Sequence, residues 1–413
     1  MAKQVTDSLM FKRQGTLAYL EGKDRLLTAP PVPEFMVGII GCGMMGQEHI
    51  RNLLLTGRAR VGGVYDPSAK SVTHALQVIT ASGQHSAAKV YPSLSEAIHD
   101  VDTDVLIIAT PNHTHLELMR SAAGCDKAIL LEKPIATSVN DAHEVYCLAD
   151  THSLPVRFGL QYRYKAIYAE AISEVFERNA LGRIHSVNML EHRFPFLDKV
   201  NQWNKFNRYS GGTLVEKCCH YFDLMNLFAG SRPQRIFALG NQAVNFRDFT
   251  YGDHQADGLD QAQVSIAYEN GVLGGFSLSM FAPGAREELV LCGEAGRLQA
   301  SEQALLGGEN HNRVDIWRGE NGASRSVSPS YPAYIARAGH HGSTFYEQLS
   351  FFDELVTGQP SGTNLADGFW SVVVGAAAQL SIERGDAVDV AEVLPSKLNA
   401  QLFDSPEIAQ VQV

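Results

Sequence analysis

Little in this sequence points to a secreted, membrane-spanning or nucleic-acid-binding protein. Six cysteines are spread over 413 residues without a CxxC spacing, so no disulfide framework is expected and a reducing, cytoplasmic compartment fits best. There is no run of about 18 apolar residues and no apolar core of a signal peptide near the start, so neither a membrane span nor secretion is expected. Lys and Arg number 34 against 45 Asp and Glu, which argues against a nucleic-acid partner.

The chain length predicts two domains, because domains commonly hold roughly 100–200 residues. Residues 1–34 are expected to form an arm, since they end in TAPPVPEF, where three prolines oppose regular structure. The two domains are then expected at residues 35–155 and 156–413.

Short apolar runs alternate with helical patterns in the first of these domains. The runs are MVGII, ARVGGVY, DVLIIAT and KAILL, and their lack of polar alternation indicates parallel strands buried on both faces. Helices are expected between them at residues 47–55, 69–81, 94–99 and 115–123. This βαβ rhythm predicts an α/β fold with a doubly wound, Rossmann-type parallel sheet.

Longer strand-like segments fill the second domain. They are RIHSVNMLEHR, QRIFALGNQAV, LDQAQVSIAYEN and GVLGGFSLSMF, and the last two are expected to form a hairpin through a turn at residues 269–271. Two late helices are expected at residues 343–357 and 365–383. We therefore expect an α+β domain with a large, mostly antiparallel sheet.

A glycine-rich turn follows the first predicted strand. GIIGCGMMGQEHI contains G-x-G-x-x-G as Gly41, Gly43 and Gly46, after a strand and before a helix, which is the context that this motif needs. The glycines would permit a tight turn, a close approach to a pyrophosphate and close helix packing. The helix N-terminus would bind the phosphates, so Met44 and Met45 within the motif are cofactor candidates as well.

An acidic residue, Asp66, follows the second predicted strand. It lies 20 residues beyond Gly46, where a carboxylate would accept hydrogen bonds from the adenosine ribose and repel a 2′-phosphate. NAD is therefore favoured over NADP. The alternative is a glycine-rich loop that binds no ligand, but motif, strand, helix and acid all agree with a dinucleotide site.

Two further segments follow buried strands and should reach the same edge of the sheet. Thr110, Pro111, Asn112 and His115 follow DVLIIA and are cofactor candidates. Asn112 could contact the ribose, or Pro111 and Asn112 could simply form the turn, and both readings stay open.

Glu132 and Lys133 follow the strand AILL and are candidates beside the nicotinamide. A lysine there can bind the reacting oxygen and share its proton, and a cationic nicotinamide nearby would lower its pKa. The Lys133–Pro134 peptide bond can be cis, which would aim the lysine side chain. The alternative is an ordinary exposed loop lysine.

The sequence GGTLVEKCCHYFDL suggests an acid–base pair. If a helix begins after the glycines, Glu216 and His220 lie four residues apart on one face, with Asp223 nearby. A carboxylate one turn away can orient an imidazole and raise its pKa, although such pairs are more often structural. Cys218 and Cys219 lack further spaced ligands, so we expect them to pack and expect no metal site.

Polar and aromatic residues between the domains are candidates for substrate binding. Gln161, Arg163 and Tyr164 follow the strand VRFGL. The segment HRFPFLDKVNQWNKFNRY could cover a polyhydroxylated substrate or pack at an interface. Its candidate side chains are Trp203, Tyr209, Arg193 and Arg208.

Taken together, these motifs resemble the glucose–fructose oxidoreductase, inositol dehydrogenase and rhizopine-catabolism family, Gfo/Idh/MocA. The resemblance runs from Met36 to about Arg384 and rests on GIIGCGMMGQEHI, IIATPNHTHLEL, LLEKPIA, GLQYRYKAIY, GGTLVEKCCHYFDLM, LCGEAGRLQAS, FFDELVTGQP and AAAQLS. It implies catalytic roles for Lys133, Glu216 and His220. Family members often carry Asp where Glu216 stands, and the extra methylene moves the carboxylate by roughly 1.5 Å.

The resemblance also implies an activity and an assembly. We expect an NAD-dependent oxidoreductase that transfers hydride between a secondary hydroxyl of a sugar, inositol or related polyol and nicotinamide. An open sheet face is expected to form a homodimer or homotetramer. The alternatives are an NAD-dependent glycoside hydrolase that acts by transient oxidation and elimination, and a non-enzymatic NAD-binding regulator.

Overall fold

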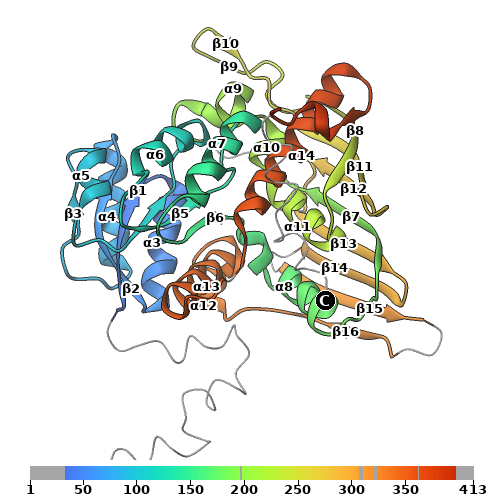
Figure 1. The fold of residues 1–413 in the computed structure, drawn as a ribbon, viewed down its shortest axis with the longest axis horizontal. Helices are drawn as coiled ribbons and strands as arrows, with labels where there is room; N and C mark the ends of the chain where they lie inside the picture. The colour runs from blue at the N-terminus through green and yellow to red at the C-terminus, as the bar shows by residue number, and fades with distance from the viewer. Residues whose placement is uncertain (1–32, 196–197, 307–309, 320–322, 361, 397–413) are drawn as a thin grey trace, which may run out of the picture.

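The described part of the chain forms two lobes built on two β-sheets (Figure 1). A computed structural model describes residues 33–195, 198–306, 310–319, 323–360 and 362–396. The expected arm, residues 1–34, lies outside the described residues except for its last two positions.

The first lobe is a doubly wound parallel sheet, as expected. Its six strands run in the order β3-β2-β1-β4-β5-β6, and neighbouring strands are parallel. The strands are β1 Phe35–Ile40, β2 Ala59–Tyr65, β3 Lys89–Val90, β4 Val105–Ile108, β5 Ala128–Glu132 and β6 Val156–Gly159. The helical segments are α3 Met44–Thr56, α4 Ala69–Ala81, α5 Leu94–His99, η2 Asn112–Thr114, α6 His115–Ala122 and α7 Val139–Asp150.

The elements of this lobe follow the predicted order. β4 and β5 are buried along their whole length, because helices cover both faces of the sheet. α4 and α5 have the predicted bounds, whereas α3 begins three residues early, inside the glycine motif. The sheet extends beyond the expected domain boundary at residue 155 by one strand, because β6 pairs with β5.

The second lobe is an α+β domain with a nine-stranded sheet in the order β16-β15-β14-β13-β7-β12-β11-β8-β17. All neighbouring pairs are antiparallel except β7 and β12. The strands are β7 Ile184–His192, β8 Pro233–Asn241, β11 Gln261–Tyr268, β12 Leu273–Ser279, β13 Arg286–Gly293, β14 Gly296–Ala304, β15 Asn310–Arg318, β16 Arg325–Val327 and β17 Val388–Asp389, and a separate ribbon contains β9 Thr250–Tyr251 and β10 His254–Gln255. The helical segments are η3 Gln161–Tyr164, α8 Ala166–Ile172, η4 Ser173–Glu177, η5 Val200–Lys205, α9 Asn207–Ser210, α10 Thr213–Glu216, α11 Cys219–Ala229, α12 Ala333–Ala336, η6 His340–Gly342, α13 Ser343–Thr357, α14 Leu365–Arg384 and η7 Val390–Glu392.

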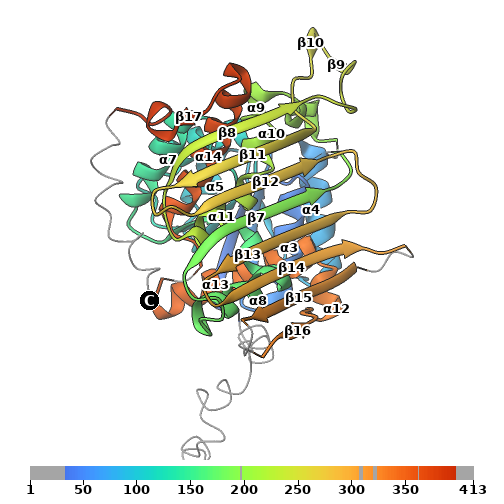
Figure 2. The same cartoon turned by 90° about the vertical axis from the view of Figure 1, so that its right-hand side faces the viewer.

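One face of the nine-stranded sheet packs on helices and the other is open. Buried and exposed residues alternate along β11, as the twofold period of a strand requires. The predicted turn joins β11 to β12, with Gly271 in the left-handed region at a φ of 86°. Figure 2 shows the open face toward the viewer, with the helices behind it. Exposed apolar side chains on its strands include Phe237, Leu239 and Leu273.

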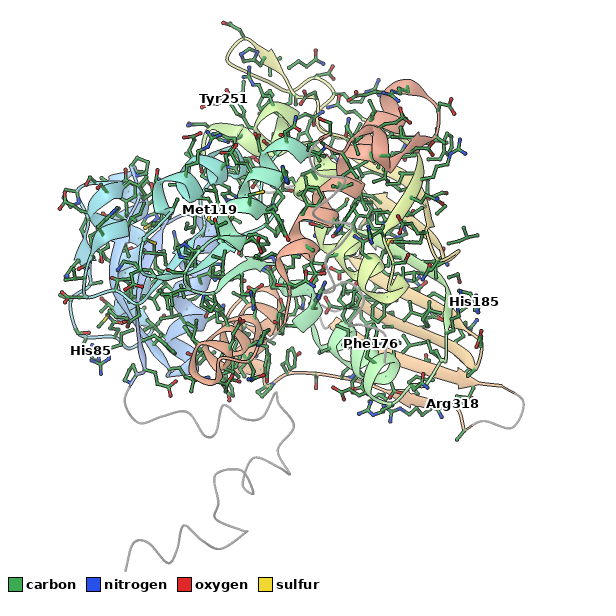
Figure 3. The ribbon with its side chains drawn as sticks, in the orientation of Figure 1. His85, Met119, Phe176, His185, Tyr251 and Arg318 are labelled. Carbon is green, nitrogen blue, oxygen red and sulfur yellow. The ribbon has the colours of Figure 1, made fainter. Side chains whose placement is uncertain are left out.

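Helices from the C-terminal part of the chain join the two lobes. α13 packs against α3 of the first lobe, and α14 packs against both α7 and α11 (Figure 1). α14 is long and apolar enough to cross a membrane by length and composition, but most of its apolar stretch is buried inside the protein, as in a core helix. His85 and His185 lie away from the helices that join the lobes, on opposite outer sides of the molecule (Figure 3).

Candidate active site

The glycine turn between β1 and α3 has the geometry of a dinucleotide-binding loop. Gly41 has a φ of 94°, and a Cβ on Gly46 would lie 1.9 Å from the carbonyl oxygen of Gly41. A Cβ on Gly43 would meet no described heavy atom within 4 Å, so the backbone is open there to an approaching group. No described side chain caps the N-terminus of α3, which leaves its N–H groups for a ligand. The turn therefore fits a pyrophosphate.

Asp66 lies directly beside this turn. Its Oδ2 accepts a hydrogen bond from the N–H of Cys42 at 2.8 Å, and its Oδ1 accepts one from the N–H of Ser68 at 2.7 Å. Each carboxylate oxygen can accept more than one hydrogen bond, so ribose hydroxyls can still bind. The contact fixes the predicted ribose-binding carboxylate relative to the glycine turn.

The loop after β4 is held by its own polar side chains. Asn112 donates to the carbonyl oxygen of Ser210 at 3.1 Å, which ties this loop to α9. The ring nitrogens of His115 lie 2.8 Å from the carbonyl oxygen of Pro134 and 3.1 Å from that of Thr110. Burial lowers the pKa of His115. Asn112 and His115 therefore fix the loop after β4, which also contains Pro111.

The side chain of Glu132 is held by His49, which lies on α3. Its Oε1 lies 2.7 Å from Nε2 of His49, and its Oε2 accepts from the N–H of Lys133 at 3.1 Å. His49 Nδ1 lies 2.8 Å from Nε2 of Gln348 on α13. Burial opposes ionisation of Glu132, but His49 outweighs it and lowers the carboxyl pKa. Glu132 thus anchors the loop that carries the candidate catalytic lysine.

Lys133 reaches from this loop to the second lobe, and its bond to Pro134 is cis, the form that the sequence allowed. Its Nζ donates to the carbonyl oxygen of Glu216 at 2.9 Å and lies 4.0 Å from Oε1 of that residue. Burial favours the neutral amine, but the carboxylates of Glu216 and Glu132 outweigh burial and raise the pKa. The alternative of an exposed loop lysine is wrong, because the side chain is only 14% exposed.

Glu216 and His220 do not share one helix, contrary to our expectation. α10 ends at Glu216 and α11 begins at Cys219. Between them the N–H of Cys218 bonds to the carbonyl of Thr213, five residues earlier, which widens the turn beyond an α-helix. Lys217, at this break, is buried, with Nζ 3.0 Å from Oε1 of Glu191 on β7. Glu216 and His220 therefore lie on separate short elements.

Glu216 is an ionised carboxylate among cations. Its Oε1 lies 3.4 Å from Nζ of Lys199 and 4.0 Å from Nζ of Lys133. Burial raises its pKa, but the two lysines and Lys217 outweigh burial and lower it to about 2. The buried Oε2 has no hydrogen-bond partner within the described part of the chain. This oxygen can accept a hydrogen bond from a substrate hydroxyl.

His220 is buried and stacks on an aromatic ring. Its imidazole lies 4.1 Å from the ring centroid of Tyr162, with 5° between the planes. Nδ1 has no hydrogen-bond partner among the described residues. The expectation of a raised pKa is wrong, because burial and then the nearby Lys133 and Lys217 hold the imidazole pKa well below its ordinary value. His220 is therefore a neutral imidazole at neutral pH.

Asp223 does not orient His220. It accepts from Nε of Arg163 at 2.8 Å, and Arg163 also lies 3.0 Å from Asp367 of α14. The guanidinium is almost fully buried between these two carboxylates, so its donors are used inside the protein. The candidate substrate residue Arg163 and Asp223, which was expected only near the same face as His220, form a buried ion pair.

Sequence reasoning missed Tyr162 and Lys217. Lys217 Nζ donates to the Tyr162 hydroxyl oxygen at 2.9 Å and lies 3.0 Å from Oε1 of Glu191. Tyr162 directly follows the candidate Gln161, and Lys217 directly follows the candidate Glu216. No motif marks either side chain, so the one available signal was its position next to a candidate residue.

Of the remaining candidates, some lie near Glu216 or have unpaired polar atoms, and the others pack within the protein. Gln161 is fully buried, and neither its amide oxygen nor its amide nitrogen has a partner in the described chain. Trp203 lies under Nζ of Lys199 at 4.6 Å, and so borders Glu216. Tyr164 donates to Ser350 at 3.2 Å and belongs to the packing against α13. Tyr209, 5.0 Å from the ring of His113, packs between the lobes.

The cysteines and acidic residues give no sign of a metal centre. Within the described ranges, no group of three His, Cys, Asp or Glu side chains is arranged to hold an ion. All six cysteines are free thiols, and burial raises the pKa of Cys219 to about 12. Cys218 and Cys219 pack in the core beside His220, as predicted.

Comparison with known protein families places the chain. The family model for oxidoreductases with an NAD-binding Rossmann fold, GFO_IDH_MocA, matches residues 35–160, and the model for the C-terminal alpha/beta domain of the same family matches residues 174–390. The chain belongs to the Gfo/Idh/MocA oxidoreductase family. The matches confirm the resemblance, the NAD-binding Rossmann domain and the two-part fold.

Relatives and solved structures are similar at low identity. Myo-inositol 2-dehydrogenase of Thermotoga maritima is 22% identical over 361 residues, 87% of this chain and 99% of that protein. The 2,7-anhydro-N-acetylneuraminate hydratase of Escherichia coli is 26% identical over 217 residues, 50% of this chain and 53% of that protein. A structure of levoglucosan dehydrogenase with NADH and levoglucosan superposes with a TM-score of 0.72 at 20% identity and covers 86% of this chain and 98% of that one, a likeness that shows the fold.

Proposed function

We propose that this protein oxidises a secondary hydroxyl of a sugar, inositol or related polyol with NAD, and runs the reverse reaction. The observation that carries the proposal is the convergence of Lys133 and Glu216 at the carboxyl edge of the parallel sheet, with His220 on the next helix. A hydroxyl placed there would meet a cation, an ionised carboxylate and a neutral imidazole, which are the groups that alcohol oxidation needs.

The glycine turn, the N-terminus of α3 and Asp66 would hold NAD. The turn fits the pyrophosphate, because a Cβ at Gly46 would clash with the backbone while Gly43 lies open. Asp66 supports NAD over NADP, since its carboxylate would repel a 2′-phosphate. When bound, NAD supplies the acceptor for the hydride that leaves the carbinol carbon.

The three catalytic side chains have separate roles. Lys133 binds the reacting oxygen and stabilises its developing negative charge. His220 accepts the hydroxyl proton, because its low pKa keeps the imidazole neutral and ready to act as a base. Glu216 accepts a hydrogen bond from a neighbouring hydroxyl through Oε2, which lacks a described protein partner.

The substrate is expected to be a small polyhydroxylated ring. Gln161, Glu216 and Glu191 each have a buried polar atom without a partner among the described residues, and several hydroxyls on one ring could satisfy them. The similarity to an inositol dehydrogenase and to a levoglucosan dehydrogenase supports the same class.

A stopped-flow experiment with NAD and a panel of cyclic polyols, hexoses, uronates and anhydrosugars tests the proposal. We expect NADH to form in a single fast phase with at least one member of the panel. Failure of every hydroxyl compound to reduce NAD, in a protein that binds NAD, would contradict it.

A second candidate is NAD-dependent elimination, in which oxidation is transient and NAD is regenerated. The similarity to an anhydrosugar hydratase favours it, although the chain covers only 53% of that protein. The readout that separates the two is stoichiometry: elimination or hydrolysis would give product without net NADH. The regulator alternative has no comparable support, because Lys133, Glu216 and His220 are all present and grouped.

We also infer that the protein assembles through the open face of the nine-stranded sheet. Leu239 and Leu273 are exposed there by 59% and 63%, and a second copy would remove them from water. Leu239→Glu is expected to lower the molar mass measured by light scattering, and an unchanged mass would count against this face. Six free thiols are in keeping with the reducing, cytoplasmic location expected from the sequence.

A further inference from the structure

The imidazole of His220 lacks the oriented carboxylate that usually fixes a catalytic histidine. Asp223 is held by Arg163, and Nδ1 of His220 has no partner within the described residues. The contact that fixes the ring is instead its stack on Tyr162, nearly parallel at 4.1 Å. A stack holds the plane of the ring without using a ring nitrogen as a hydrogen-bond partner.

Tyr162 is itself held at its hydroxyl and its ring. The hydroxyl oxygen accepts from Lys217 at 2.9 Å, and the hydroxyl donates to Oε1 of Glu287 at 3.4 Å. The edge of Tyr221 packs against the ring at 5.4 Å and 88°. Lys165 and Lys217 lie 4.9 and 5.0 Å from its centroid. The aromatic ring therefore has little freedom to move beneath the imidazole.

The groups that anchor Lys217 and Tyr162 form a row of like charges. Glu191, Glu287 and Glu302 lie directly opposite one another on β7, β13 and β14. Such a row is destabilising by itself, because like charges across neighbouring strands repel. Lys217 at 3.0 Å from Glu191, and Lys165 at 2.7 Å from Glu287, offset the repulsion. A costly charge network of this kind is typical of functional sites.

We propose that Tyr162 and Lys217 are positioning residues for His220, with the tyrosine ring fixing the plane of the imidazole and the lysine ammonium, bonded to the tyrosine hydroxyl, adding positive charge beside it. This inference rests on the proposed function, in which His220 takes the hydroxyl proton. Neither residue touches the substrate in this account. Lys217 acts through its charge and through the tyrosine hydroxyl, and Tyr162 acts through its face.

The electrostatic part of the proposal has a definite direction. Burial lowers the pKa of His220 first, and nearby cations lower it further. The charged or titratable groups around the ring are Lys133 after β5, Lys217 between α10 and α11, Lys165 before α8, His340 before α13, Glu216 at the end of α10, and Glu191 and Glu287 on the sheet. Removal of Lys217 takes away one cation and leaves Glu191 without it, and both changes raise the imidazole pKa.

The first test is the pH profile of NAD reduction in Lys217→Met. The wild-type rate should stay flat as pH falls through the ordinary histidine range, and the acid limb of Lys217→Met should move up by about one pH unit. Lys217→Arg keeps the charge, so its limb should stay at the wild-type position whatever its maximal rate. Lys127→Met is the matched control, since Lys127 is also buried but bonds backbone carbonyls at the opposite edge of the sheet.

The second test separates the ring from the charge. Tyr162→Leu should lower kcat roughly 10–100-fold through misplacement of the imidazole, with little change in KM. Tyr162→Phe keeps the stacking face but loses the hydroxyl, so its kcat should fall less than that of Tyr162→Leu. Equal kcat for Tyr162→Leu and wild type, or an unmoved acid limb in a Lys217→Met protein that binds NAD normally, would overturn the proposal.

A direct titration distinguishes failure of this inference from failure of the proposed function. If no compound in the panel reduces NAD, the proposed function fails. The imidazole pKa can still be read by NMR on ¹³C-histidine-labelled protein, with the His220 signal identified from His220→Gln. A higher pKa in Lys217→Met than in wild type supports the positioning role, and identical values refute it.

Discussion

Two buried histidines, one in each lobe, differ in the partners of their ring nitrogens. His49, on the cofactor-binding helix, lies 2.7 Å from the Glu132 carboxylate and 2.8 Å from the Gln348 amide, one partner for each ring nitrogen. His220, on the substrate side, has no described partner for Nδ1 and stacks on Tyr162. His49 has a partner for each ring nitrogen, whereas Nδ1 of His220 has none in the described part of the chain.

The same contrast extends to the groups around each histidine. On the cofactor side, the side chains of Asp66, Asn112 and Glu132 all bond to neighbouring protein atoms. On the substrate side, Gln161 and Glu216 keep buried polar atoms without partners in the described chain. Unpaired buried polar atoms are costly, and at Gln161 and Glu216, which lie near Lys133 and His220, a ligand could supply the missing hydrogen bonds.

The largest effect is expected from substitution of Lys133 or His220. Lys133→Ala and His220→Ala should each slow hydride transfer by roughly 10²–10⁴-fold, because each removes a group that handles the reacting oxygen or its proton. NAD binding, measured by fluorescence quenching, should change little. Normal single-turnover rates in both variants would show that His220 is not the catalytic histidine.

Sequence alone predicts the cofactor side well, because its information is local. Gly41, Gly43 and Gly46 lie within six residues of chain, and Asp66 follows at the spacing that a strand and a helix require. The same reasoning placed Lys133 at the correct edge of the sheet.

The substrate side was predicted less well, because its contacts join distant segments. Lys217 meets Tyr162 across 55 positions, and Arg163 meets Asp223 across 60. No periodicity reports such pairs, so the sequence did not show that Arg163 holds Asp223 or that Lys217 bonds to Tyr162. The break between α10 and α11 falls at Lys217, whose side chain is buried.

The next largest effect is expected from substitution of a glycine in the turn between β1 and α3. Gly46→Ala should weaken NAD binding by about 10–100-fold and destabilise the fold by about 1–3 kcal/mol, because the added Cβ would lie 1.9 Å from the carbonyl oxygen of Gly41. Gly43→Ala is the matched variant: its Cβ meets no described atom, so only NAD affinity should fall. Calorimetric titration and thermal unfolding separate the two outcomes, and equal stability losses would argue against the described turn.

A smaller effect is expected at the paired histidine. His49→Ala should lower the free energy of unfolding by about 1–3 kcal/mol, because Glu132 then loses a buried hydrogen-bond partner. The rate of hydride transfer at saturating NAD and substrate should fall far less than in His220→Ala. A loss of rate equal to that of His220→Ala would remove the distinction between the two histidines.

The smallest effect concerns a buried carboxyl on α13. Both oxygens of Glu347 lack a described partner, and burial, then Glu132 and Glu48, hold its pKa well above the ordinary value. A raised pKa gives stability below the unfolded-state pKa, and this stability is lost as pH rises. Glu347→Gln should therefore raise the unfolding free energy by about 1 kcal/mol or more at pH 8 and by less at pH 5. An equal change in Tm at both values would contradict the shift.

The central claim is that this cleft moves hydride from a carbinol carbon to NAD. The most direct measurement is a single-turnover reaction with a polyol deuterated at the reacting carbon, followed by mass spectrometry of the nicotinamide product. The account predicts deuterium in the NADH and a slower reduction than with the unlabelled polyol, both lost in His220→Ala. Turnover without transfer of the label to nicotinamide would contradict it.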